Sequence, residues 1–557
     1  MIASAICVPA QNRYDVVIDE VMADPSPPVG LPANEWIEIT NTSTTTINLL
    51  NWRIGDATSQ SGPMPSFVLQ PGAFVIICAA SAVSTMSTYG NVISVTSFPS
   101  LDNDGDVIYL KSNSGMIIHA VNYSIDWYKN DLKKDGGWSL EMIDVNSSCV
   151  GKTNWTASTD ISGGTPGRIN AITAITNDTK APGIKNAFAP DRYTIVIVFD
   201  ETVDSSAASA ISKYSIDGGI IVTHAMPLPP LFHQVQLKTT IPLADTTVYT
   251  ITARDIADCK GNSLITTARV GWPSDATKGE WIVNEILFNP RTAGYDYVEL
   301  YNNSNKILDA HGLYIANRNS SGIISSIKAI SNRPYYIFPK EYIVITEDAG
   351  ILAMNYHVKN PEQVFTIASP PSFPDDGGAV VALNSQGEVV DEVQYNHNWH
   401  FKLLDNEEGV ALERIDPSAL SQDASNWHSA ASSAGYGTPT YINSQYKKIA
   451  GSGAVFEITP SIFSPDNDGR DDILTIHYQL PLNGYVMNVT IFDAMGRMVK
   501  NLVRNAIAGI NGYFIWDGLD DRMRRLPIGA YIVFTEIFNL QGKREIFKEV
   551  ITLAGRR

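Results

Sequence analysis

Residues 35–41 read Glu-Trp-Ile-Glu-Ile-Thr-Asn, and residues 296–302 read Asp-Tyr-Val-Glu-Leu-Tyr-Asn. In the first stretch Trp36 and Glu38 alternate with Ile37 and Ile39. This period of two is typical of a half-buried β-strand, with one face on a core and the other toward solvent. The same pattern stands at two distant places in the chain, so the pair predicts β-sheet domains and an internal repeat.

The likeness extends on both sides of these stretches, because further landmarks recur in the same order. The matching pairs are Val17-Ile-Asp-Glu20 with Ile282-Val-Asn-Glu285, residues 71–77 with 339–345, Trp127 with Trp399, Ser139-Leu-Glu141 with Ala411-Leu-Glu413, and Asn154-Trp155 with Asn426-Trp427. Gly-Thr-Pro closes both segments, at 164–166 and at 437–439. One domain type therefore occurs twice, and we expect a compact β-sandwich over residues 14–172 and again over 279–444.

The composition fits several packed domains. A chain of 557 residues suggests about four of them. Hydrophobic residues make up 44%, which excludes collagen, coiled coils and long disordered tails. Lys and Arg number 40 against 58 Asp and Glu, and the net charge of −18 argues against nucleic-acid binding, which needs clustered basic residues. No stretch approaches about 18 uninterrupted apolar residues, so we expect no transmembrane segment.

The repeated segments resemble a known family. The Glu-Trp-Ile-Glu motif at 35–38, its counterpart at 296–299, the strand after Pro71 and the Asn-Trp and Gly-Thr-Pro ending are similar to the lamin tail domain. The resemblance covers both copies, which are over half of the chain. It implies an immunoglobulin-like β-sandwich, found in nuclear lamins and in many secreted bacterial proteins, that acts as a non-catalytic interaction module.

Residues 177–275 follow a different pattern. The strand-like run Tyr193-Thr-Ile-Val-Ile-Val-Phe199 leads into Asp200-Glu-Thr-Val203. Further on, the turn Asp258-Cys-Lys-Gly-Asn262 contains a Gly-Asn pair that tolerates positive φ. This segment resembles the bacterial Ig-like module of cell-surface proteins, which implies a spacer sandwich between the two repeats.

Residues 452–557 form the last predicted domain. They contain Ser464-Pro-Asp-Asn-Asp-Gly469, Trp516-Asp-Gly518 and an alternating strand over 545–553. These marks resemble the Ig-like domain of the flagellar hook-cap family and the C-terminal sorting domains of type IX secretion. The resemblance implies the export machinery as a partner. The chain departs from the commonest sorting pattern because it ends Ala554-Gly-Arg-Arg557 rather than on a lysine-rich strand.

The cysteines and the first residues bear on location. Residues 1–10 are small and apolar and end on Ala10, which predicts the remnant of a signal peptide, with a frayed N-terminus as the alternative. Loss of Cys7 with that peptide leaves Cys78, Cys149 and Cys259. Because Cys78 and Cys149 fall in one predicted domain, we expect a disulfide between them in an exported protein. Two unpaired thiols are the alternative.

The best metal-binding candidate lies at the start of the last domain. In Asp466-Asn-Asp468-Gly-Arg-Asp-Asp472, oxygen ligands alternate around a glycine turn, as in calcium loops. We therefore take Asp466, Asp468 and Asp472 as candidate calcium ligands, and calcium is the one cofactor that the sequence suggests. Arg470 occupies a ligand position and no glutamate closes the loop, so a solvated acidic turn is the alternative.

Evidence for catalysis is weak. The recurring acids at 20, 38 and 141, and at 285, 299 and 413, are compatible with a glycosidase pair, but no His, Lys or Arg recurs beside them. The sequence lacks a nucleophile elbow, a P-loop and a dinucleotide fingerprint. We therefore predict a protein that is not an enzyme and has no catalytic residues, in which the repeated acids are structural or orient a ligand.

Together these observations predict an all-β protein of tandem Ig-like β-sandwich domains in series. We expect a bacterium to export it and to place it outside the cell or on the outer-membrane surface. Its expected role is structural or adhesive, with an unidentified extracellular protein or polysaccharide as ligand. Two alternatives stay open, namely a carbohydrate-targeting accessory module and a cryptic hydrolase that acts on an extracellular polymer.

Overall fold

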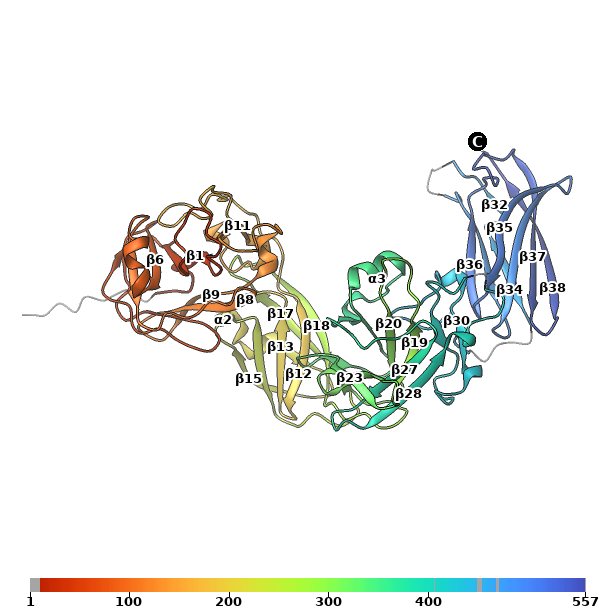
Figure 1. Cartoon of the computed structure of the whole chain (residues 1–557), viewed down its shortest axis with the longest axis horizontal. Helices are drawn as coiled ribbons and strands as arrows, with labels where there is room; N and C mark the ends of the chain where they lie inside the picture. The colour runs from red at the N-terminus through yellow and green to blue at the C-terminus, as the bar shows by residue number, and fades with distance from the viewer. Residues whose placement is uncertain (1–10, 405, 448–452, 467–469, 556–557) are drawn as a thin grey trace, which may run out of the picture. The chain divides into compact units, whose positions relative to one another are not determined.

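A computed structural model describes residues 11–404, 406–447, 453–466 and 470–555. The chain divides into two compact units, the first formed by residues 1–244 and 248–271 and the second by 245–247 and 272–557. Strands dominate both units (Figure 1), which confirms the predicted all-β class of tandem β-sandwiches. The expected signal-peptide remnant at 1–10 lies outside the described residues.

The first unit begins with a sandwich built on a six-stranded sheet. In spatial order its strands are β11 (Trp155–Ala157), β10 (Leu140–Met142), β1 (Val16–Met22), β2 (Trp36–Asn41), β6 (Phe74–Ala79) and β7 (Val92–Val95). The opposing strands are β4 (Arg53–Gly55), β8 (Gly105–Lys111) and β9 (Ile117–Ser124), with the small pair β3 (Ile47–Asn48) and β5 (Val68–Leu69). A short helix, α1 (Val83–Met86), follows β6.

A second sandwich completes the first unit. One sheet has the order β12 (Ile184–Asp191), β13 (Thr194–Phe199), β16 (Gln234–Thr239) and β15 (Val222–Pro227). The other has the order β14 (Tyr214–Ile216), β17 (Tyr249–Ala257) and β18 (Ser263–Val270). Helix α2 (Ser205–Ala208) begins at Asp204, whose side chain accepts a hydrogen bond from Ala207 N and so caps the first turn.

The second unit repeats the first sandwich. Its six-stranded sheet has the order β30 (Trp427–Ser429), β29 (Leu412–Arg414), β19 (Trp281–Leu287), β20 (Tyr297–Asn302), β25 (Tyr342–Thr346) and β26 (Val364–Thr366). Strand by strand this is the order of the first sheet, and in both sheets only the last pair is parallel. The opposing sheet is β23 (Ile324–Ala329), β22 (Tyr314–Arg318), β27 (Gly377–Leu383) and β28 (Val389–Asn396), beside the pair β21 (Leu308–Asp309) and β24 (Tyr336–Ile337). Helix α3 (Ala349–Asn355) follows β25.

The last sandwich also belongs to the second unit. Its small sheet has the order β31 (Val455–Thr459), β33 (Leu474–Gln479) and β36 (Asn511–Trp516). The large sheet has the order β32 (Ile462–Phe463), β38 (Arg544–Leu553), β37 (Gly529–Asn539), β34 (Tyr485–Asp493) and β35 (Met498–Ile507). No helix among the described residues is long and apolar enough to cross a membrane.

The strands that carry the repeat are buried on both faces, unlike the half-buried strand that the alternation predicts. Every residue of β2 is buried. Ile37 and Ile39 pack in the core between the sheets, whereas Trp36 packs outside it with Met86 of α1. The segment that follows β11 covers the remaining part of this outer face, around Glu38, as the next subsection describes. A polar side chain in a strand can thus be buried by a distant loop.

The structure corrects the predicted disulfide. Cys149 is bonded to Cys259, with 5.9 Å between their Cα atoms, and Cys78 is a buried free thiol. The Cys78–Cys149 prediction is therefore wrong. Its physical reason is local: Cys78 lies within β6 and packs beside Trp36 on the outer face of the sheet, where burial raises the pKa of its thiol to about 11. Cys149 lies in the loop before β11 and pairs with the β17–β18 turn.

Candidate functional site

A row of three glutamates crosses each six-stranded sheet. In the first sandwich Glu20 of β1 is the register partner of Glu38 on one side and of Glu141 on the other. In the repeat Glu285 of β19 stands in the same way between Glu299 and Glu413. All six side chains are 0% exposed. We call each set of three a carboxylate row.

A β-bulge adds a fourth polar residue to each row. The register shifts between Ile18 and Glu20 in β1, and between Val283 and Glu285 in β19. A bulge places two residues opposite one, which breaks the simple alternation of faces. The extra residue is Asp19 in the first sandwich and Asn284 in the second. Both lie beside the carboxylate row.

The closing segment of each sandwich, residues 163–172 and 436–445, is bonded to its row. In the first copy the backbone N–H of Thr165 donates to Glu20 Oε1 at 2.7 Å, and its hydroxyl lies 2.9 Å from Glu141 Oε1. The N–H of Gly167 donates to Glu38 Oε2. This explains why Gly-Thr-Pro ends both repeats, because each residue of the row accepts a bond from the segment that this motif begins.

The second copy makes the same bonds. Thr438 N donates to Glu285 Oε1 at 2.9 Å, the Thr438 hydroxyl lies 2.9 Å from Glu413 Oε1, and Thr440 N donates to Glu299 Oε2 at 2.6 Å. The equivalence is therefore residue by residue, and it extends the internal repeat from strand order to hydrogen bonding.

Burial favours the neutral form of Glu20 in the first row and of Glu285 in the second. The Thr438 hydroxyl lies within hydrogen-bond distance of both Glu285 and Glu413, but a hydroxyl has one proton to donate, so the second contact needs a protonated carboxyl. Burial, and then the neighbouring Glu413, raise the pKa of Glu285 to about 8. Burial likewise raises the pKa of Glu20 well above its usual range, with Glu141 as the next cause.

The two rows differ at the bulge. Asn284 Nδ2 donates to Glu299 Oε1 at 2.8 Å. Asp19 replaces this amide in the first copy, and within the described residues neither of its oxygens, nor Glu38 Oε1, meets a hydrogen-bond donor. Burial raises the pKa of Asp19 to about 8, and burial followed by Asp19 raises that of Glu38 to about 11. Asp19 and Glu38 thus carry raised pKa values at the place where, in the second copy, the asparagine amide donates to the glutamate.

Each carboxylate row accepts hydrogen bonds that hold the closing segment against its sheet. Carboxyls with no exposed surface cannot reach a polymer substrate, and each of these six accepts a hydrogen bond from the chain's own closing segment. The best catalytic candidates of the sequence are thus buried beneath the closing segment in both copies.

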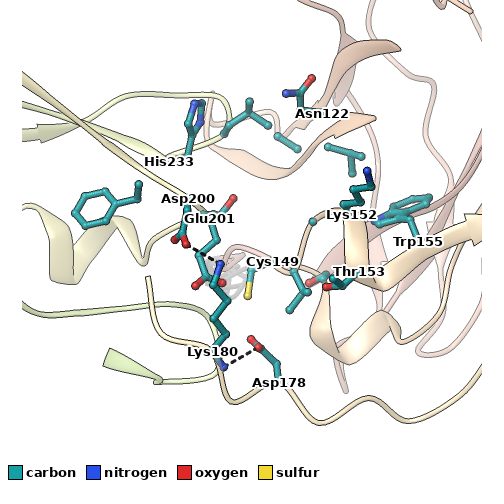
Figure 2. Close-up of a pocket in the computed structure, with 18 of the residues that line it drawn as sticks. Asn122, Cys149, Lys152, Thr153, Trp155, Asp178, Lys180, Asp200, Glu201 and His233 are labelled. Carbon is teal, nitrogen blue, oxygen red and sulfur yellow. Dashed lines mark hydrogen bonds and ion pairs between the residues drawn. The ribbon is translucent and has the colours of Figure 1, made fainter. Parts of the chain in front are cut away.

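Asp178, Asp200 and Glu201 line a cavity of about 590 Å³ in the first unit (Figure 2). The cavity lies between the first two sandwiches: Trp155 and Lys152 come from the first, and Asp200, Glu201 and His233 from the second. Carboxylate oxygens of Asp178, Glu201 and Asp258 all lie within 4.8 Å of one another, and this is the only such group of three or more possible metal ligands in the described part of the chain.

We call Asp178, Glu201 and Asp258 the acidic trio. Hydrogen bonds hold two of its members in place. Asp258 Oδ1 accepts from the N–H groups of Lys260 and Asn262 at 2.8 and 2.9 Å, in the turn that carries the disulfide. Asp178 Oδ1 accepts from Lys180 N at 3.1 Å. The Lys180 ammonium itself pairs with Asp200 at 2.6 Å, and Figure 2 marks both Lys180 contacts.

The trio also has oxygens without donors. Asp178 Oδ2 and Glu201 Oε1 are shielded from solvent and meet no donor among the described residues. Burial raises the pKa of Glu201 to about 7, and the carboxylates of Asp200, Asp178 and Asp258 act in the same direction. Three clustered carboxylate oxygens supply part of the shell that a hard cation such as Ca²⁺ takes. Sequence reasoning missed this group because its members come from three separate segments.

The predicted calcium loop is only partly described. Asp468 lies outside the described residues, while Asp472 Oδ1 accepts a hydrogen bond from Asp466 N at 3.1 Å. Calcium binding by Asp466, Asp468 and Asp472 stays a prediction. Four large aromatic side chains near loops are not exposed platforms for sugar rings, because Trp127, Tyr128, Tyr356 and Tyr395 are each less than 9% exposed.

Comparisons with known proteins place one part of the chain. The family model of the Lamin Tail Domain matches residues 9–124. No curated protein matches the sequence. This result supports the lamin-tail resemblance for the first sandwich.

Solved structures give weak likenesses. The N-terminal part of the bacterial S-layer protein SbsC is 14% identical, with 30% of this chain and 40% of that chain covered and a TM-score of 0.16. A DUF4876 family protein from Bacteroides thetaiotaomicron is 13% identical over 37% of this chain and 84% of that one, with a TM-score of 0.17. PorZ from Porphyromonas gingivalis, a surface component of the type IX secretion system, is 9% identical over 94% and 74%, with a TM-score of 0.16. The chain thus spans two fifths of the S-layer fragment, and scores this low support no inference about function.

Proposed function

We propose that the protein is a non-catalytic, exported array of β-sandwich modules that serves a structural or binding role outside the cell. The proposal is supported mainly by the burial of the six repeated glutamates and by their hydrogen bonds. Their carboxyls are 0% exposed and bonded to the closing segments, so they stabilise each sandwich and are not available to a substrate.

The module assignment is part of this proposal. Residues 14–172 and 279–444 are taken as two lamin-tail domains, supported by the family match at 9–124 and by the shared strand order, bulge and carboxylate row of the second copy. Residues 177–275 are taken as an Ig-like spacer. Residues 452–557 are taken as a hook-cap-like domain that addresses the protein to the export machinery.

Export is supported by the disulfide. Cys149 and Cys259 come from different sandwiches of the first unit, and such a bond persists in oxidising compartments rather than in the cytosol of a mesophile. It closes a loop of 110 residues, a length for which loop closure is worth about 3–5 kcal/mol in chain entropy. The bond therefore fastens the spacer to the first lamin-tail domain once the protein has left the cytosol.

Fractionation of the producing cell tests the proposal, with the full chain compared with a form that lacks residues 452–557. We expect the full chain in the medium or on the surface and the shortened chain in the periplasm. Retention of both forms in the cytosol would overturn export. Release of reducing ends from a panel of polysaccharides by the purified protein would overturn the non-catalytic assignment.

A further inference from the structure

A second cavity lies in the second unit and has an unusual wall. It measures about 530 Å³ and is bounded by the end of α3, by the closing segment of the repeated sandwich and by β36 of the last sandwich. A volume of this size is in the range of sites for small ligands.

Tyrosine rings form much of this wall. Tyr513 on β36 is 55% exposed, and Tyr441 and Tyr446 of the second closing segment and the residues after it are half-buried. The ring of His357 lies edge-on to Tyr441, with 5.8 Å between ring centroids. Tyrosine offers an apolar face together with a hydroxyl that donates and accepts hydrogen bonds. The wall can therefore pack against an apolar surface and also form hydrogen bonds.

The rest of the wall is polar but carries no fixed charge. Asn355 and Asn511 supply amide groups, whereas the buried Asn443 amide is bonded to Asn284 and to Arg414 O. No Asp, Glu, Lys or Arg stands among the described residues that line the cavity. This neutrality is notable in a chain with a net charge of −18. A charged ligand would find no counter-ion here, so desolvation of its charge would be uncompensated.

The two sandwiches hold the wall together. Ile510 N donates to Ser444 O at 3.0 Å, and the hydroxyls of Ser433 and Tyr478 lie 2.8 Å apart. Gly512 is required at this contact, because a Cβ there would lie 2.5 Å from the Tyr478 hydroxyl oxygen and 2.8 Å from Ser433 Oγ. The cavity is therefore preorganised from both sides rather than open space between loose domains.

We propose that this cavity binds a short neutral oligosaccharide. The C–H faces of sugar rings pack on aromatic rings, and their many hydroxyls need partners that donate and accept, which amides and tyrosine hydroxyls provide. The inference rests on the proposed binding role, to which it adds a site and a ligand class. The tyrosines that matter come from two different modules, which is why no single sequence motif identifies them.

Isothermal titration of the purified full chain tests this assignment. The probes are soluble hexasaccharides of neutral β-glucan, xylan, mannan and chitin, with polygalacturonate as an anionic comparison. Tyr513→Ala and Asn511→Ala remove exposed groups of the wall, so both variants should fold. The matched control is Tyr193→Ala, which removes a 49% exposed tyrosine from the first unit.

We expect at least one neutral probe to bind and its affinity to fall about tenfold or more in Tyr513→Ala, because truncated aromatic anchors cost that much at binding sites. Tyr193→Ala should bind like the wild type. The inference is overturned if no neutral probe binds, if only polygalacturonate binds, or if Tyr513→Ala and Asn511→Ala both bind unchanged. These outcomes are separate from a failure of the proposed function, which would show as reducing ends released or as retention in the cytosol.

Discussion

Replacing Asp19 with asparagine is expected to stabilise the first sandwich at neutral pH. Asp19 occupies the bulge position that Asn284 holds in the repeat, where the amide donates to Glu299 at 2.8 Å. In the variant the new amide can donate to Glu38 in the same way, and no proton is needed to bring the two side chains together.

The magnitude follows from the raised pKa. Asp19 has a pKa of about 8 in the fold against about 3.9 in an unfolded chain. At pH 7 the folded state therefore holds a proton that the unfolded state has released, and this uptake costs up to about 4 kcal/mol. One hydrogen bond to a carboxyl is worth about 1–3 kcal/mol. We expect Asp19→Asn to raise the free energy of unfolding by about 1–4 kcal/mol at pH 7.

The sign of the pH dependence is fixed by the same shift. Below about pH 4 Asp19 is protonated in both states, so its contribution does not vary with pH. As pH rises from about 4 to about 8 the wild type loses stability, because only the unfolded state ionises, and above pH 8 the loss levels off. The advantage of Asp19→Asn should therefore grow across this window. Glu20 and Glu38 belong to the same row, have raised pKa values and remain in the variant, so a smaller slope persists.

Hydrogen exchange is the suitable assay, because a melting curve of a multi-domain chain mixes several transitions. Mass spectrometry of the full chain reports β1 and β19 separately. In Asp19→Asn, exchange in β1 should slow while exchange in β19 is unchanged. The reciprocal Asn284→Asp should speed exchange in β19 at pH 8 more than at pH 5, and Asp135→Asn at an exposed site is the control. Faster exchange of β1 in Asp19→Asn would refute the predicted gain in stability.

Three further outcomes are expected. Thr438→Val removes the hydroxyl between two buried carboxyls and should destabilise the repeated sandwich by about 1–3 kcal/mol, seen as faster exchange over 436–445; unchanged exchange would refute the fastening role. Glu201→Gln should remove a loss of stability that the first unit shows as pH rises from about 4 to 7, because the raised pKa of about 7 keeps Glu201 protonated only in the fold; identical pH profiles would argue against it. If Asp466, Asp468 and Asp472 bind calcium, excess calcium should slow hydrogen exchange in the last sandwich and Asp472→Asn should abolish the slowing, whereas unchanged exchange with calcium would count against that site.

The fold was predictable where the sequence repeats itself. Alternation around Glu38 and Glu299 predicts two strands, which the structure contains as β2 and β20. The fixed order of landmarks predicts one sandwich type in two places, and the two six-stranded sheets have the same strand order. Burial of those strands on both faces was not predictable in this way. An alternating pattern assigns Glu38 and Glu299 to the solvent-exposed face. In the structure a closing segment far along the chain covers these glutamates and donates hydrogen bonds to them.

The sequence also could not predict which residues of different sandwiches contact one another. The rule that two cysteines of one domain pair led to Cys78 and Cys149, but Cys78 packs on the outer face of its sheet and Cys149 meets Cys259 of the next sandwich. The sequence gives no sign of the acidic trio or of the tyrosine-lined cavity for the same reason. Their residues come from segments that only the tertiary structure brings together, and no spacing along the chain records it.

Non-reducing peptide mapping is the most direct test of the Cys149–Cys259 disulfide in the exported protein. The protein is recovered from the medium or the cell surface, and its free thiols are alkylated in denaturant before digestion. We predict one cross-linked pair of peptides that contains Cys149 and Cys259, together with alkylated Cys78. Alkylation of all three cysteines, in a protein found only in the cytosol, would contradict both the disulfide between the first two sandwiches and the proposed life of this protein outside the cell.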